Sequence, residues 1–239
     1  MIRLPVPKGR IADRVTLLRA ERHYLLDVLR LAPGAKLEVF DGEGGRYPAA
    51  LEPDGSLSLG AREEALHAGR RLALAQALAK GDKMDLVVQK ATELGVDRIS
   101  PFTSSRCVVR LGAAKAEDRV VRWQRIAEEA ARQCGRADVP QVAPVQPLEA
   151  MIGRHRAEGS RVLLLFEHET ARGLSQALLA SADPLVLVVG PEGGFAGEEI
   201  AAARSQGAEI VSLGPLILRT ETAGLAAIAV TRFLDGELG

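Results

Sequence analysis

The chain has 239 residues, of which 47% are hydrophobic and 26% charged, a balance typical of a globular protein with one large or two small domains. No apolar run approaches the roughly 18 residues of a membrane span, and the N-terminal segment lacks the apolar core of a signal peptide. The two cysteines, Cys107 and Cys134, are not spaced like metal ligands, so we expect a cytoplasmic protein without a membrane segment or a metal site.

The first 70 residues are typical of a small, mostly β domain. A helix is predicted around Glu21 to Leu31, because Pro33-Gly34 would end it. An Asp-Gly pair lies between two segments in which apolar and polar residues alternate, Leu37–Phe40 and Tyr47–Leu51. This arrangement is a strong signal for a β-hairpin. A further short strand is predicted at 56–59, and the charged segment 62–71 is the expected linker.

From Leu72 the sequence alternates between strand and helix patterns. Strands are predicted at 72–79, 96–99, 162–166, 185–189 and 209–213. Helices are predicted at 82–94, 116–134, 174–180, 198–206 and 221–234. This alternation predicts an α/β domain over residues 72–239 with a mainly parallel sheet.

The formal charge of zero hides an asymmetry along the chain. Residues 80–136 hold 12 basic and 8 acidic side chains, whereas residues 137–239 hold 7 and 13. Such a split favours one face for a polyanion, although ordinary solvated helix surfaces give the same numbers.

Two glycine-bearing loops each follow an apolar strand and lead into a helix. GPEGGF, at 190–195, follows LVLVV, and LGPLILRTETA, at 213–223, follows EIVS. Loops at the carboxyl ends of parallel strands are where open α/β sheets bind ligands, and glycines let a ligand approach the backbone. A nucleotide-dependent enzyme is one alternative, but the first loop lacks the G-x-G-x-x-G spacing of dinucleotide sites.

These two loops resemble the signature of the RsmE family of SPOUT-class methyltransferases. Residues 80–110 and 123–140 resemble the same family, and residues 23–44 fit its small N-terminal domain, so the likeness covers nearly the whole chain. The resemblance implies a trefoil-knotted α/β domain with a mainly parallel sheet, behind a PUA-like β domain that docks RNA. It also implies a homodimer that uses the small residues of the last helix.

The activity implied by the resemblance is methyl transfer from S-adenosylmethionine (SAM) to N3 of a uridine in 16S ribosomal RNA. The substrate would be either free RNA or the assembled small subunit. Two alternatives stay open: a SPOUT methyltransferase with another target base, and a non-catalytic factor of ribosome assembly.

Eleven residues are candidates to bind SAM, whose adenine and methionine chain fit an apolar slot with backbone hydrogen bonds. They are Leu165, Phe166, Glu167, Gly190, Glu192, Gly194, Leu213, Gly214, Leu218, Thr220 and Ala223. The alternative for each glycine is a tight strand-to-helix turn without a ligand.

Arg219 and Glu221 are the candidate catalytic residues. Glu221 at the start of the last helix has a local explanation, since the helix dipole favours an acid there, and Thr220 could cap the helix. A cation at the same end is disfavoured, so Arg219 points to an anion such as a nucleotide.

Ten cations are candidates to contact RNA phosphates, which would supply affinity without sequence information. They are Arg3, Lys8, Arg10, Arg30, Lys83, Lys90, Arg106, Arg110, Arg125 and Arg136. Because aromatic residues form only 3% of the chain, we expect recognition by shape and charge rather than by base stacking.

Overall fold

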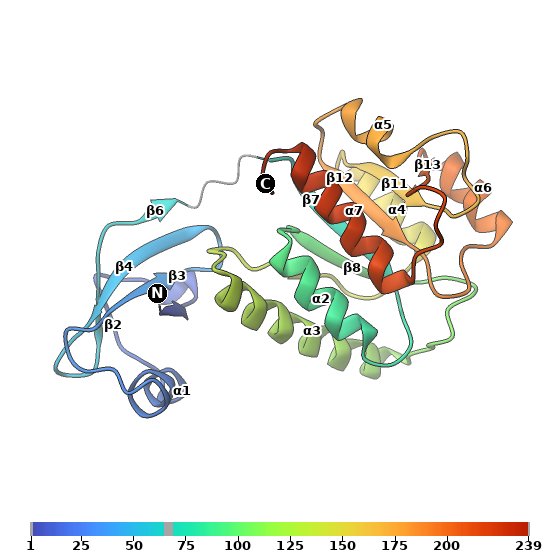
Figure 1. Cartoon of the computed structure of the whole chain (residues 1–239). Coiled ribbons are helices and arrows are strands. Elements are labelled where there is room, and N and C mark those ends of the chain that lie inside the picture. The colour runs from blue at the N-terminus through green and yellow to red at the C-terminus, as the bar shows by residue number, and fades with distance from the viewer. Residues whose placement is uncertain (1, 65–68, 239) are drawn as a thin grey trace. The chain divides into compact units, whose positions relative to one another are not determined.

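The computed structural model describes residues 2–64 and 69–238 and divides them into two compact units (Figure 1). The first unit contains the described residues up to Glu64 together with Glu128–Val139, and the second contains the remainder. Helix α3 (Ala113–Cys134) therefore contributes to both units, which a boundary near residue 70 does not anticipate. Residues 65–68 of the expected linker lie outside the described residues.

The first unit is built on a six-stranded sheet in the order β1-β3-β4-β5-β2, with β6 paired to β4. The hairpin predicted from the Asp-Gly pair joins β3 to β4, which run antiparallel, and β1 runs parallel to β3. The strands are β1 (Arg3–Pro5), β2 (Arg14–Val15), β3 (Lys36–Phe40), β4 (Gly45–Leu51), β5 (Leu57–Leu59) and β6 (Glu63–Glu64). The mostly β architecture predicted from the sequence is confirmed.

The predicted first helix is wound differently from a regular α-helix. A 3-10 turn, η1 (Lys8–Arg10), is followed by α1 (Arg19–Arg22), which continues into a π-helical segment, η2 (His23–Val28). The wider turn buries Leu25 completely against the sheet of this unit. Arg30 then ends the segment with a φ of 53°, a left-handed conformation that non-glycine residues rarely adopt.

The second unit is a seven-stranded sheet in which every pair of neighbouring strands is parallel. The order is β10-β8-β7-β12-β11-β13, and β9 also pairs with β8. The strands are β7 (Leu72–Ala77), β8 (Arg98–Thr103), β9 (Gln141–Val142), β10 (Gln146–Pro147), β11 (Arg161–Leu165), β12 (Leu185–Val189) and β13 (Glu209–Val211). The predicted parallel sheet is confirmed.

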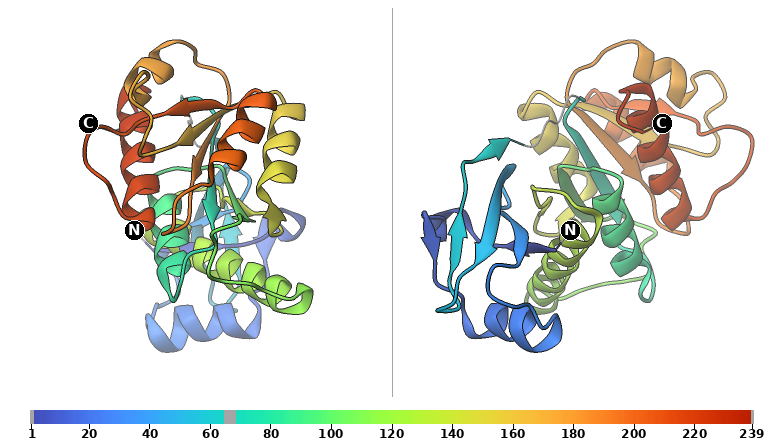
Figure 2. Two further views of the ribbon diagram at one scale, coloured as in Figure 1. Left: turned by 90° about the vertical axis from the view of Figure 1, so that its right-hand side faces the viewer. Right: turned by 60° about the vertical axis from the view of Figure 1, so that its left-hand side comes forward.

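Helices cover both faces of this sheet. They are α2 (Lys83–Glu93), α4 (Leu148–Ala157), α5 (Leu174–Leu179), α6 (Gly197–Ser205) and α7 (Thr220–Leu234). In the left view of Figure 2, α2, α5 and α7 lie on one side of the sheet and α4 and α6 on the other. A parallel sheet covered on both faces needs strands that are apolar throughout, and all five residues of β12 are buried.

Several elements depart from the sequence prediction: β9 and β10 were not predicted, and β8 extends to Thr103 rather than ending at residue 99. β8 begins at Arg98 rather than at residue 96, because Gly95 ends α2 with a φ of +90° and Val96 is buried before the strand starts. Helix α4 was not predicted, although Leu148, Met151, Ile152 and His155 are buried at helical spacing. The threading of a trefoil knot stays a prediction from the family resemblance.

The small residues of α7 pack on the sheet of their own unit. A Cβ atom at Gly224 would lie 3.3 Å from Leu74 and 3.4 Å from Val189, and Ala227 is completely buried. Gly224 and Ala227 are therefore not free to contact a second copy, whereas Ala223, Ala226 and Ala229 are half-buried, and the dimer that uses this helix stays a prediction. The exposed apolar residues of α7 are Val230, Phe233 and Leu234.

The C-terminal end of α7 is held by a buried arginine. Arg232 is 2% exposed and donates hydrogen bonds to the carbonyl oxygens of Arg70, at 2.9 Å, and Gly95. Its guanidinium also lies 2.8 Å from the carboxylate of Glu237. These bonds join the end of α7 to the start of β7 and the end of α2.

None of the helices within the described ranges combines the length and apolar character of a membrane span.

We expect Arg232→Ala to lower the free energy of unfolding by about 3–5 kcal/mol, because it leaves buried carbonyl and carboxylate oxygens without their partner. Urea denaturation measures the loss. Arg154→Ala is the matched control, since Arg154 forms a partly exposed ion pair with Glu158 at 3.2 Å, and it should cost less than about 1 kcal/mol. Equal effects of the two substitutions would contradict a supporting role for Arg232.

Candidate functional site

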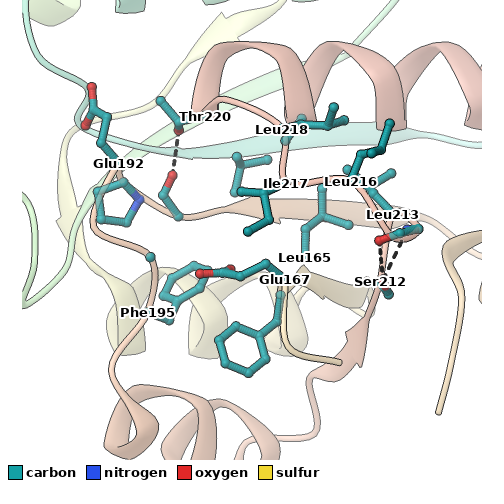
Figure 3. Close-up of a pocket in the computed structure, with 17 residues that line it drawn as sticks. Leu165, Glu167, Glu192, Phe195, Ser212, Leu213, Leu216, Ile217, Leu218 and Thr220 are labelled. Carbon is teal, nitrogen blue, oxygen red and sulfur yellow. Dashed lines mark hydrogen bonds between the residues drawn. The ribbon is translucent and has the colours of Figure 1, made fainter. Parts of the chain in front are cut away.

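A pocket opens where β11, β12 and β13 end and α7 begins (Figure 3). Its empty space, open mouth included, is about 680 Å³. All eleven residues selected from the sequence as cofactor candidates line it. Six further residues line it as well, four of them within the two loops predicted from the sequence: Val189, Pro191, Phe195, Ser212, Leu216 and Ile217. Leu216 and Ile217 are 76% and 80% exposed, so the rim of the pocket is apolar and open.

Glycine is required at two positions of the loop after β12. Gly194 has a φ of +66°, and a Cβ atom there would lie 2.5 Å from the Oε1 atom of Glu167. A Cβ atom at Gly190 would lie 2.9 Å from the ring of Phe195, which itself stacks on Phe102. The glycines therefore let this loop fold closely beside the end of β11, and they keep the floor of the pocket free of side chains.

The hydroxyl group of Thr220 joins three elements beneath the pocket. It donates a hydrogen bond of 2.6 Å to the carbonyl oxygen of Gly190 and accepts one of 2.8 Å from the Nε2 atom of Gln76. Gln76 is completely buried on β7. Sequence reasoning missed it, although a lone amide in the apolar segment LALAQALA was a visible signal.

Lys83 links two acidic residues beside the pocket. Its Nζ atom lies 3.0 Å from Glu192, which lines the pocket, and 3.2 Å from Glu221 on the first turn of α7. The hydrogen bond with Glu192 raises the pKa of Lys83, so the ammonium stays charged. Burial raises the pKa of Glu192, but hydrogen bonds from Lys83 and from backbone N–H groups outweigh it, and the net pKa lies below its usual value.

Arg219 occupies the N-cap position of α7, and its exposed side chain makes no capping hydrogen bond. Its carbonyl oxygen accepts bonds of 2.8 Å from the N–H groups of Thr222 and Ala223. Among the described residues its guanidinium has no hydrogen-bond or ion-pair partner within the chain. It follows β13's loop directly and precedes Thr220, which lines the pocket. The cation that the helix dipole disfavours is therefore available to an external anion.

Most of the ten cations selected for RNA contact already have partners within the chain. Six form ion pairs: Arg3 with Glu38, Lys8 with Glu43, Arg10 with Glu21, Lys83 with Glu192 and Glu221, Lys90 with Glu93, and Arg136 with Asp138. Arg106 donates a bond of 3.0 Å to the carbonyl oxygen of Gly193, beside the pocket. Arg30, Arg110 and Arg125 are exposed without a side-chain partner among the described residues.

Metal ligands were not expected from the sequence. Within residues 2–64 and 69–238, no group of three or more His, Cys, Asp or Glu side chains is placed to hold a metal ion.

Comparisons with known proteins agree with this architecture. Residues 67–232 match a family model described as an RNA methyltransferase domain, and residues 17–59 match one described as an RNA methyltransferase PUA domain. Ribosomal RNA small subunit methyltransferase E of Mycobacterium bovis is 35% identical over 90% of this chain and 84% of its own length. The Bacillus subtilis protein of the same name is 30% identical over 89% of this chain and 87% of its own length.

Solved structures of methyltransferases share this fold as well. The crystal structure of a ribosomal RNA small subunit methyltransferase E from Neisseria gonorrhoeae, bound to SAM, is 33% identical, with a TM-score of 0.84 over 98% of both chains. A structure from Legionella pneumophila with SAM as bound cofactor is 29% identical, with a TM-score of 0.78 over 98% of this chain and 97% of that one. Sequence identity and shared fold together show that the chain belongs to the ribosomal RNA small subunit methyltransferase E family.

Proposed function

We propose that this protein transfers the methyl group of SAM to N3 of a uridine in the 16S RNA of the small ribosomal subunit. The observation that carries the proposal is the pocket at the carboxyl edge of the parallel sheet, with its glycine floor and apolar walls. Relatives that share the whole fold are named as ribosomal RNA small subunit methyltransferases, and one of them is bound to SAM.

The pocket fits the chemical groups of SAM. Leu165, Leu213 and Leu218 offer apolar surface for the adenine ring and the methionine chain, and the close-packed glycine loop offers backbone groups. Glu167 supplies a carboxylate at the pocket for hydroxyl or ammonium groups. SAM, when bound, supplies a methyl group that its positively charged sulfur already activates. The protein therefore has to place the base and assist the loss of its proton.

Arg219 is the residue we assign to the uracil base. N3 of uracil carries a proton and is a poor nucleophile until it loses it, and the resulting negative charge spreads over the flanking carbonyl oxygens. A guanidinium near one of those oxygens stabilises that charge, as an oxyanion hole does. Arg219 has the required freedom, since it is exposed beside the pocket without a partner among the described residues. Glu221 either accepts the proton or orients Arg219.

The assembly we propose is a cytoplasmic homodimer that acts on 16S ribosomal RNA, either free or in the small subunit. Val230, Phe233 and Leu234 form an exposed apolar strip on one face of α7, at helical spacing. Exposed apolar surface of this kind is typical of a contact between proteins.

Incubation with labelled SAM and either free 16S RNA or small subunits, followed by nucleoside analysis, tests the activity directly. Label in 3-methyluridine supports the proposal and identifies the substrate. Label in another nucleoside would leave a methyltransferase with a different target base. No label in either substrate, with SAM binding intact, would favour a non-catalytic assembly factor.

SAM should bind without a metal ion, and filling the pocket should weaken binding. Ala223→Leu adds three carbon atoms to a residue that lines the pocket, so we expect at least about tenfold weaker binding. Calorimetry with SAM after chelator treatment measures this, and NAD should give no heat. Ala201→Leu, at an exposed position on α6 outside the pocket, is the control. An unchanged affinity of Ala223→Leu would remove the first turn of α7 from the cofactor site.

Arg219→Ala should slow single-turnover methylation by about 10²–10³, the usual cost of one lost donor to a developing anion, and change SAM affinity little. Raising the pH should partly restore the rate, because the solvent then removes the N3 proton without help. Arg219→Lys keeps the charge but not the planar donor group, so its rate should fall between those of the wild-type protein and Arg219→Ala. Lost SAM affinity with an intact rate in the bound state would instead make Arg219 a cofactor ligand.

Sedimentation should give about twice the chain mass of 25.4 kDa. Phe233→Asp should dissociate the dimer without unfolding it, because Phe233 is 65% exposed in the single chain. Val121→Asp, at a similarly exposed apolar residue on α3, should leave the dimer intact. A wild-type protein that is monomeric at micromolar concentration and still methylates RNA would contradict the proposed assembly.

A further inference from the structure

Lys83 is the bridge between two loops that frame the pocket. Glu192 belongs to the loop after β12, and Glu221 belongs to the first turn of α7. Because the Nζ atom of Lys83 lies 3.0 Å from one carboxylate and 3.2 Å from the other, their nearer oxygens are at most 6.2 Å apart. Two carboxylates so close repel each other unless a cation lies between them.

Within the described ranges, Lys83 is the cation that neutralises Glu192 and Glu221. Among the described residues, no other basic side chain lies within 4 Å of either carboxylate. The backbone N–H of Lys80 donates to the same oxygen of Glu192, at 3.2 Å. On α2, Asp85 is already paired with Arg122, and Asp82 stands at the N-cap position without a capping hydrogen bond from its side chain. On α7, the neighbouring cation is Arg219, which is exposed and unpaired within the described chain.

The side chains of the bridge are partly shielded from water. The side chain of Lys83 is 33% exposed, that of Glu192 31% and that of Glu221 14%. Salt and water therefore screen the bridge less than they screen a fully exposed pair. A phosphate contact would have to compete with two carboxylates already bound to the ammonium, which argues against the RNA role expected from the sequence.

We propose that Lys83 is a positioning residue of the methyl-transfer site, which holds the loop after β12 against the first turn of α7. The inference rests on the proposed function for its kinetic consequence, whereas the bridge itself can be tested without turnover. Without the ammonium, the carboxylates either move apart or one of them takes up a proton. A displacement of about 1 Å in such a site costs up to about 100-fold in rate.

The test compares Lys83→Met, which removes the charge, with Lys83→Arg, which keeps it. Carboxyl NMR of protein labelled with 13C in glutamate, assigned with Glu192→Gln and Glu221→Gln, follows the titration of Glu192. We expect its midpoint to rise in Lys83→Met, because the ammonium that favours the charged carboxylate is gone, and to stay near the wild-type value in Lys83→Arg. Arg154→Met, which breaks the ion pair on α4, is the control and should leave the midpoint and the rate unchanged.

The kinetic arm uses single turnovers at saturating SAM and RNA, with SAM affinity measured separately by calorimetry. Lys83→Met should be about 10- to 100-fold slower, and Lys83→Arg should recover most of the rate. Melting curves check that the variants are folded. A wild-type midpoint and rate in Lys83→Met would overturn the proposal.

A phosphate contact predicts a different pattern. Lys83→Met and Lys90→Met, on the same helix, would then weaken RNA binding equally and flatten its salt dependence, with the saturated rate unaltered. That result would also overturn the proposal. If the wild-type protein methylates no ribosomal RNA, the proposed function fails, and the carboxyl titration still decides whether Lys83 holds the two glutamates.

Discussion

The buried hydroxyl group of Thr220 is the contact on which the pocket depends. It bonds to the Gly190 carbonyl and to the Gln76 amide, so the loop after β12, the centre of the sheet and the start of α7 meet at one atom. A buried polar group costs free energy unless it is paired, and the Nε2 group of Gln76 and the hydroxyl group of Thr220 pair with each other. The geometry therefore fixes where α7 begins, and with it the positions of Arg219, Glu221 and Ala223.

The packing of α7 on the sheet depends on the same junction. Gly224 lies against Leu74 and Val189 at distances that leave no room for a larger side chain, so the helix can approach the sheet closely directly after Thr220. In Figure 1, α7 lies across β12 and β7, the two central strands. Its other end is tied down by Arg232, whose guanidinium bonds to carbonyl groups at the start of β7 and the end of α2. A helix held at both ends, about 18 Å apart, presents its first turn as a rigid wall of the pocket.

Local sequence pattern predicted the parts of this fold that depend on local chemistry. The continuous apolar run of β12 predicted its bounds correctly, and the glycine loops predicted the pocket's position, because close backbone approach needs glycine wherever it occurs. The π-helical turns of η2 and the return of Glu128–Val139 to the first unit were not predicted. Both depend on tertiary packing: Leu25 is drawn into a core formed by distant strands, and a periodic helix such as α3 carries no mark of where one unit ends.

The charged residues show most clearly the difference between properties set by local sequence and properties set by tertiary structure. The sequence indicates how many cations a segment carries, but not which of them a carboxylate already neutralises. Lys83 and Glu192 are 109 positions apart, and nothing local to either residue predicts that they meet. Arg219 was the opposite case, because its unfavourable place at a helix N-terminus is a local property. A cation at such a position without a partner retains its full attraction for an external anion, whereas one that is paired has already lost most of it. Binding residues are therefore better chosen by the charges that the fold leaves uncompensated than by charge alone.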